Sequence, residues 1–140
     1  MVLSAALTLA PLAGPAHAGT RAGRYRAKML SFVNDFRAHS GLGALRDDRK
    51  VDGLAWKHSL RMARDRRLFH TTDLTQKLRY LDPSAWGENV GVGPSIWRVF
   101  KAFRGSAPHR ANMLNGRYHA AGVGVVRAHG GYWITMIFYG

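Results

Sequence analysis

The last ten residues, GYWITMIFYG, constrain the fold more than any other segment, because nearly every position is apolar. Successive side chains of a strand point to opposite faces of its sheet, so a solvated face requires alternating polar residues. Both alternating sets are apolar here, namely Tyr132, Ile134, Met136 and Phe138 on one face and Trp133, Ile137 and Tyr139 on the other. We therefore expect helices packed on each face of a central sheet.

The rest of the chain supplies a second strand and the helices that such a sheet needs. AAGVGVV, residues 120–126, and the last strand flank the turn sequence HGG at 129–131, which predicts a hairpin. Apolar residues recur at helical spacing over 29–36, and Asp47 or Asp48 can cap a second helix. With 140 residues, no internal repeat and no linker, the chain is predicted to form one domain.

Shorter helical segments lie between these elements. Thr72 or Asp73 is placed to cap a short helix, and Pro94 suits the first turn of the helix PSIWRVFKAFRGS. The next stretch, APHRANML, is expected to be a loop or a short helix. His58 falls on the apolar side of the second helix, so we interpret it as a packed core histidine and not as a metal ligand.

Residues 1–18 carry no charge and end in the A-x-A-like sequence Ala16-His17-Ala18. This composition is typical of a secretory signal peptide, which would leave a mature domain over residues 19–140. The usual positively charged start is missing, and a membrane anchor is the alternative, but Pro11 and Pro15 break the apolar run. No later segment has the ~20 apolar residues of a membrane span, so we expect a secreted or cell-envelope protein without a transmembrane segment in its mature chain.

Charge limits the class of partners that the protein can bind. Lys and Arg outnumber Asp and Glu by 21 to 8, a net charge of +13, and none of it lies in residues 1–18. Such a surface favours polyanions, and export favours an anionic lipid or a cell-wall polymer over nucleic acid. The basic run at 61–67 is either the solvated end of the second helix or a polyanion-binding face. The chain has no cysteine, which excludes a thiol nucleophile and cysteine metal sites and is typical of an exported bacterial protein.

Three short stretches hold the residues that can carry chemistry: FHTTDL with His70, WGENV with Glu88 and SAPHRANML with His109. Glu88 is the only glutamate of the chain, and we expect each of the three residues in a loop at the edge of a helix or strand. Two imidazoles and a carboxylate suit a metal site or acid–base chemistry, and imidazole is a good ligand for Zn²⁺. The gaps of 18 and 21 residues match no helical metal motif, so only the fold can bring these side chains together.

Taken in order, these stretches resemble the CAP superfamily, also called the SCP domain, and in particular its compact, cysteine-free bacterial branch. The motifs that carry the resemblance are LSFVNDFRAHSGLGAL, LAWKHSLRMA, FHTTDL, WGENV, PHRANML, AAGVGVV and YWITMIFYG, which cover nearly the whole mature chain. The resemblance implies an α+β fold, a three-layer α-β-α sandwich with a mainly antiparallel central sheet. It also implies a surface cavity lined by two histidines and acidic residues.

In that cavity, the resemblance implies that His70 and His109 are Zn²⁺ ligands and that Glu88 faces the space between them. A hydrogen bond from a buried backbone group to Glu88 is a second, compatible role. Many family members carry another acid on the helix before the second histidine, whereas no Asp or Glu lies between residues 94 and 108 here. A mechanism that needs paired carboxylates is therefore in doubt, and Asp73 is better explained as a helix cap.

Neighbouring polar residues are interpreted as structural. Asn89 and Asn112 follow the cavity residues closely, and asparagine side chains often satisfy loop backbone groups. His119 and His129 lie in loop-like surroundings and are expected to face solvent. Arg110 either binds an anion beside the cavity or pairs with an acid.

Three functions are compatible with these features. The favoured one is a secreted binding module whose cavity holds a metal or a small hydrophobic ligand and whose cationic exterior binds envelope lipid or cell-wall polymer. The second is a zinc-dependent hydrolase of the peptidase kind with Glu88 as candidate base, although two protein ligands are fewer than the three of catalytic zinc. The third is a cationic antimicrobial or toxin-like effector. No P-loop, G-x-S-x-G or H-E-x-x-H signature occurs.

Overall fold

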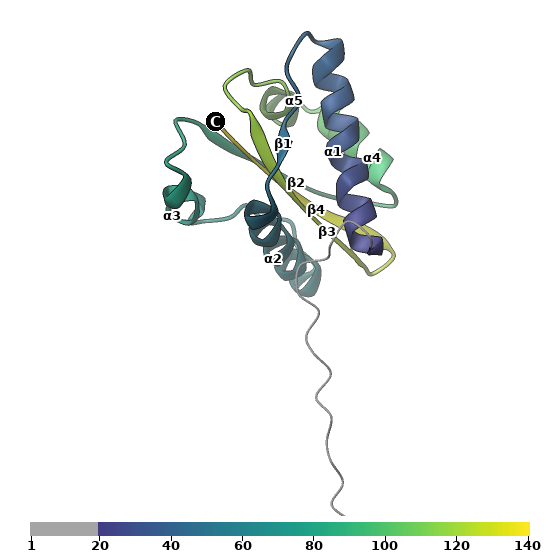
Figure 1. The fold of residues 1–140 in the computed structure, drawn as a ribbon. Helices are drawn as coiled ribbons and strands as arrows, with labels where there is room; N and C mark the ends of the chain where they lie inside the picture. Colours follow the sequence, from purple (N-terminus) through teal and green to yellow (C-terminus); the bar gives the residue numbers. More distant parts are fainter. Residues whose placement is uncertain (1–19) are drawn as a thin grey trace, which may run out of the picture.

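The structure, a computed structural model, describes residues 20–140, so the predicted signal peptide at 1–18 lies outside the described residues. Helices cover both faces of one four-stranded sheet, as the apolar C-terminal strand predicts (Figure 1). The fold is α+β and is the expected three-layer α-β-α sandwich.

The central sheet has the strand order β1-β3-β4-β2, with β1 at Arg46–Asp47, β2 at Trp86–Gly93, β3 at Ala120–Ala128 and β4 at Gly131–Tyr139. Strand β4 pairs antiparallel with β2 on one side and with β3 on the other, whereas the short β1 pairs parallel with β3. The sheet is therefore mainly antiparallel, and β2 forms one of its edges.

The predicted hairpin joins β3 to β4 through a tight two-residue turn. Its central residues, His129 and Gly130, have left-handed backbones with φ of 52° and 74°. Positive φ at both positions matches the right-handed twist of the flanking strands, which is why such turns favour glycine. His129 is exposed at this turn, and His119 is exposed just before β3, as expected for both.

Helices α1 (Arg21–His39), α4 (Ile96–Gly105) and α5 (Ala107–Met113) cover one face of the sheet. Their apolar side chains and those of the strands form the larger core, which includes Met29, Val33, Phe100, Phe103, Met113, Val123 and Met136. The segment after α4, which the sequence leaves as a loop or a short helix, is the short helix α5.

Helix α4 begins slightly later than predicted. Ser95 is its N-cap, and the Ser95 side chain accepts the backbone N–H of Arg98. Pro94 therefore lies just before the cap and not in the first turn.

Helix α2 (Arg49–Asp65), helix α3 (Leu74–Leu78) and the 3-10 turn η1 (Arg79–Leu81) cover the other face. Asp48 caps α2, as one of the two predicted caps, and accepts the backbone N–H groups of residues 50 and 51. Asp73 holds the N-cap position of α3, but its side chain makes no cap hydrogen bond and pairs with Lys77 instead. The predicted cap role of the Asp73 side chain is wrong.

Buried polar side chains join α2 to the sheet and to α1. Asp52 accepts the backbone N–H of Val123 at 2.8 Å and forms an ion pair with Arg26 of α1 at 2.8 Å. Ser59 donates to the backbone carbonyl of Gly124 at 3.0 Å. Asp52 and Ser59 thus bond to backbone groups of β3 that lie beyond the end of the short strand β1. A longer β1 would otherwise pair with these groups.

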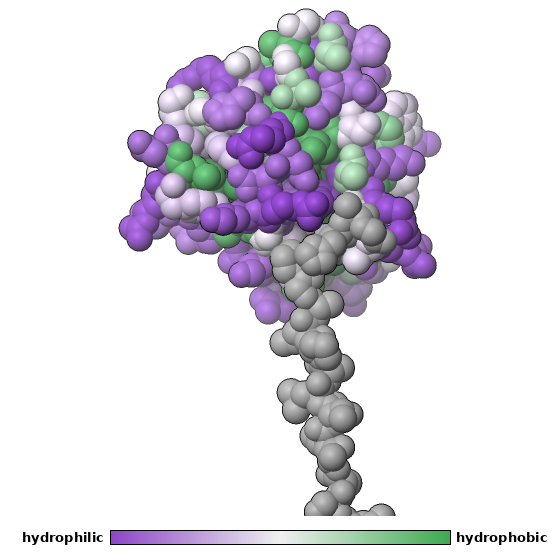
Figure 2. Space-filling view, in the orientation of Figure 1, coloured by the Kyte–Doolittle hydropathy of each residue, from purple (hydrophilic) through white to green (hydrophobic). Residues whose placement is uncertain are grey.

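One face of the molecule is mostly polar. Figure 2 shows that the side of the molecule seen in Figure 1 is largely hydrophilic, with only small apolar patches. All Lys and Arg residues occur from Arg21 onward, so the net charge of +13 belongs to the described part of the chain. No helix within residues 20–140 combines the length and the hydropathy needed to cross a bilayer.

Candidate functional site

Glu88 is the third residue of edge strand β2 and does not lie in the predicted loop. In the register of β2 with β4, Glu88 is opposite Ile137, which packs in the core on the α2–α3 side. Opposite residues of an antiparallel pair share a face, so Glu88 also points to that side, and Asn89 points to the α5 side. The Glu88 side chain is 4% exposed, and a carboxylate so buried needs hydrogen-bond donors close by.

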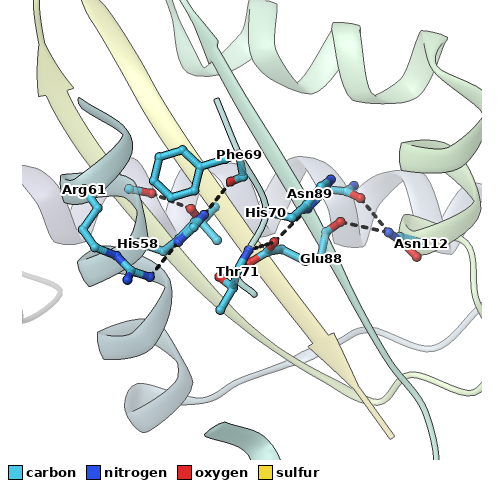
Figure 3. A network of polar contacts seen from close by, with 10 residues as sticks. His58, Arg61, Phe69, His70, Thr71, Glu88, Asn89 and Asn112 are labelled. Carbon is cyan, nitrogen blue, oxygen red and sulfur yellow. Dashed lines mark hydrogen bonds and ion pairs between the residues drawn. The ribbon is translucent and has the colours of Figure 1, made fainter. Parts of the chain in front are cut away.

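The donors come from the loop between α2 and α3. Glu88 Oε1 accepts from His70 Nδ1 at 2.8 Å and from the backbone N–H of Thr71 at 2.9 Å. Glu88 Oε2 accepts from the Thr71 hydroxyl at 2.6 Å (Figure 3). The backbone role that the sequence leaves open for Glu88 is therefore confirmed. Thr71 is a site residue that sequence reasoning missed, although it stands beside His70 in the motif FHTTDL.

His70 is held by one nitrogen and open at the other. A carboxylate only accepts hydrogen bonds, so the imidazole donates from Nδ1, and Nε2 is left for a ligand or a proton. The His70 side chain is 63% exposed. The ring is thus oriented by a buried anion and faces solvent.

His109 lies in the short helix α5, one of the two alternatives that the sequence leaves for this stretch. Its ring stacks on Phe103 with centroids 4.9 Å apart, and its Nδ1 is 2.8 Å from the hydroxyl of Ser106. Burial lowers the pKa of His109, and the charge of His70 lowers it further. Both effects favour the neutral form of the His109 ring.

Asn89 and Asn112 join β2 to α5 and have the structural role predicted for them. Asn89 Nδ2 donates to the carbonyl of His109 at 3.0 Å. Asn112 Nδ2 donates to the carbonyl of Glu88 at 3.2 Å and to Asn89 Oδ1 at 2.9 Å (Figure 3). A Cβ at Gly87 would lie 2.7 Å from Asn112 Oδ1, so this close link requires the glycine of the WGEN motif.

The site offers a metal ion two imidazoles, each with a partner that orients it. Glu88 holds His70, Ser106 contacts His109, and such outer partners are typical of histidines that bind metals. No group of three or more His, Cys, Asp or Glu side chains within residues 20–140 is placed to hold a metal. Two imidazoles are fewer than the three protein ligands of catalytic zinc.

Two other predicted candidates lie apart from this chemistry. The exposed Arg110 donates from Nη1 to the carbonyl of Arg104 at 2.9 Å, and it forms no ion pair with an acid of residues 20–140. His58 is 1% exposed and donates to the carbonyl of Phe69, which confirms its interpretation as a core histidine.

Comparison with known proteins identifies the family. The model of the cysteine-rich secretory protein family, CAP, matches residues 30–138. The chain belongs to the CAP family. The resemblance found in the sequence motifs is therefore confirmed. A separate comparison with curated protein sequences finds no match.

Solved structures support the CAP fold. An extracellular protein from Bacillus anthracis that contains a SCP domain is 22% identical with a TM-score of 0.74, over 84% of this chain and 40% of that chain. A cysteine-rich secretory protein from Staphylococcus aureus is 22% identical with a TM-score of 0.71, over 86% and 40%. An outer surface protein from Borrelia burgdorferi is 18% identical with a TM-score of 0.72, over 81% and 90%. This CAP chain therefore spans less than half the length of the first two proteins.

Replacing Glu88 by Ala is expected to destabilise the protein by about 2 kcal/mol, because the partly buried amide of Thr71 loses its charged acceptor. Denaturant unfolding measures the free energy, and hydrogen exchange should show lost protection at the Thr71 amide. Asp65→Ala is the matched control, since it removes an exposed acid at the end of α2 and should change stability by less than about 0.5 kcal/mol. Equal stability of Glu88→Ala and the native protein would contradict the structural role of Glu88.

Proposed function

We propose that this CAP protein is an exported binding module, not an enzyme, and acts at the bacterial cell envelope or outside the cell. The observation that supports this is the engagement of Glu88, whose two oxygens accept hydrogen bonds from His70 and Thr71 in a buried position. A general base must reach the proton that it abstracts, and Glu88 has its acceptors directed into the α2–α3 loop. The absence of Asp and Glu between residues 94 and 108 leaves this site without the second carboxylate of a paired mechanism.

Two observations support export: the N-terminal sequence and the descriptions of two structurally similar proteins. Residues 1–18 have the composition of a signal peptide. The similar protein from Bacillus anthracis is described as extracellular, and the one from Borrelia burgdorferi as an outer surface protein. We therefore place this chain outside the cytoplasm.

The proposed partner is an anionic lipid surface or an acidic cell-wall polymer, because the protein carries +13 charges and export separates it from nucleic acid. The end of α2 and the residues after it carry four exposed arginines, namely Arg61, Arg64, Arg66 and Arg67. Binding by such side chains weakens as salt screens their charge.

The test measures binding to isolated cell walls and to vesicles with anionic or neutral headgroups, in dilute and in concentrated salt. Affinity for the anionic targets should fall at least tenfold across the salt range, and neutral vesicles should not bind. The double variant Arg64→Ala/Arg67→Ala should weaken binding more than Arg98→Ala/Lys101→Ala, which removes the same charge from exposed positions of α4. Equal affinity in dilute and concentrated salt would refute the electrostatic part of the proposal.

We further propose that His70 and His109 hold Zn²⁺ weakly through their Nε2 atoms, with the other positions filled from solvent or ligand. Calorimetric titration should show one-to-one binding in the native protein and none in His70→Ala or His109→Ala. Absence of zinc binding in the native protein would remove the metal from the proposal and leave the polyanion surface as the binding element.

A further inference from the structure

Helix α2 and the segment 71–77 enclose a cavity of about 340 Å³ that none of the preceding arguments uses. Residues 54, 57 and 61 of α2 line it and are spaced by three and four, so they share one flank of the helix. Leu74 and Lys77, also three apart, line it from α3. The volume lies within the range of small-molecule sites.

The inner wall of the cavity is apolar. Leu54 comes from α2, Leu74 from α3 and Ile137 from β4. Leu74 and Ile137 are only 3% and 1% exposed, so they belong to the core beneath the cavity. An apolar group of a ligand would lose contact with water on entering, which favours binding.

The charged side chains around the cavity are all basic, namely Lys57, Arg61 and Lys77, and no acidic residue lines it. Lys57 makes no hydrogen bond or ion pair within residues 20–140, and Arg61 bonds only to the uncharged ring nitrogen of His58 in that range. Lys77 is the exception, because Asp73 pairs with it. The positive charge of Lys57 therefore has no acidic partner among residues 20–140, whereas Arg61 is near enough to Asp73 to help lower the pKa of that carboxyl.

His58 positions Arg61 at this cavity. His58 Nε2 is 2.7 Å from the carbonyl of Phe69, which only accepts, so Nε2 carries the proton. The other ring nitrogen, Nδ1, then accepts from Arg61 Nη2 at 3.1 Å (Figure 3). Because one nitrogen of the guanidinium is held by a buried ring, less side-chain freedom is lost when the other N–H groups bind a ligand.

We propose that this cavity binds a small organic anion with one apolar tail, of the medium-chain carboxylate class. The tail packs on Leu54, Leu74 and Ile137, and the carboxylate lies between Lys57 and Arg61. A volume of about 340 Å³ equals roughly a dozen water-sized volumes of ~30 Å³, which suits one chain of about ten carbons. The two tails of a membrane lipid are too large. This site does not depend on zinc, and it shares only Arg61 with the proposed polyanion-binding surface.

The test uses three probes with the full chain: decanoate below its micelle concentration, decanol with the same tail and no charge, and acetate with the charge and no tail. Calorimetry should show decanoate binding about tenfold or more tightly than decanol, and no saturable binding of acetate. Amide NMR shifts on adding decanoate should centre on residues 54–61 and 71–77. Equal affinity for decanoate and decanol would overturn the assignment of a carboxylate site.

Single variants then test the two cations. Lys57→Ala and Arg61→Met should each weaken decanoate binding about five- to tenfold. Lys101→Ala is the matched control, since it removes an exposed charge from α4 and should leave affinity unchanged. Because Lys57 has no partner among residues 20–140, its variant keeps the fold intact, and full affinity in Lys57→Ala would refute the proposal. So would shifts centred on the aromatic cavity between α1 and α4, which is lined by Phe32, Phe36, Trp97 and Phe100.

Discussion

Gly124→Ala is expected to destabilise the protein by about 3 kcal/mol or more, because α2 lies directly against the backbone of β3 at this glycine. A Cβ at Gly124 would lie 2.2 Å from the carbonyl carbon of Ala55 and 2.2 Å from the backbone nitrogen of Trp56. Backbone atoms cannot rotate aside as a side chain can, so the helix itself would have to move. Movement of α2 would also break the hydrogen bond from Ser59 to the Gly124 carbonyl.

Gly53→Ala is the control for this substitution. Gly53 lies inside α2, and a Cβ there would have no heavy atom within 4 Å. Alanine is the better helix former, so this variant should be more stable by up to about 1 kcal/mol. Chemical denaturation of both variants measures the two effects, and a Gly124→Ala protein as stable as the native one would show that α2 does not pack this closely.

Arg37→Met is expected to cost about 4 kcal/mol, because it leaves buried carbonyl groups without donors. Arg37 lies in α1 and is 2% exposed. Its guanidinium donates to four backbone carbonyls, those of Gly43, Met113, Asn115 and Tyr118, at 2.8 to 3.1 Å. Three of these carbonyls lie between residues 113 and 118, at and after the end of α5, so Arg37 fixes the helix that carries His109.

Arg37→Lys separates charge from geometry. Lysine keeps the charge, but its single ammonium cannot reach four carbonyls in the fork geometry of a guanidinium. We expect Arg37→Lys to lose most of the same stability, and hydrogen exchange near residues 113–118 to rise in both variants. Thermal and denaturant unfolding measure the free energy of unfolding. A value for Arg37→Met within about 1 kcal/mol of the native one would show that these carbonyls do not depend on Arg37.

Some elements could be predicted because their cause is local. The hairpin turn needs left-handed backbone at residues 129 and 130, and the HGG sequence shows it directly. The apolar residues of β4 on both alternating faces predict helices on both sides of the sheet, which the two helical layers confirm. The Asp73 cap failed because the side chain pairs with Lys77, a competing partner one helical turn away.

The candidate site could be predicted only in part. The motifs contain His70, Glu88 and His109, yet nothing local reveals that Glu88 lies in a strand. Nor does it reveal that the short helix with His109 packs on the other face of the sheet. Thr71 is an ordinary loop threonine in the sequence, and it supplies two of the hydrogen bonds to Glu88 only because the loop after α2 folds over the edge strand.

The sequence by itself determined the family, the α+β layering, the charge of the surface and the identity of the two histidines and the glutamate, because these follow from composition, periodicity and motifs. Only the tertiary structure decided what those residues are free to do. Burial of Glu88 commits its oxygens to His70 and Thr71, and the packing of α2 against β3 and α3 creates the basic-rimmed cavity beside them. The physical reason is that hydrogen bonding and desolvation depend on which segments, distant in the sequence, meet in the fold. No short stretch of the chain contains that information.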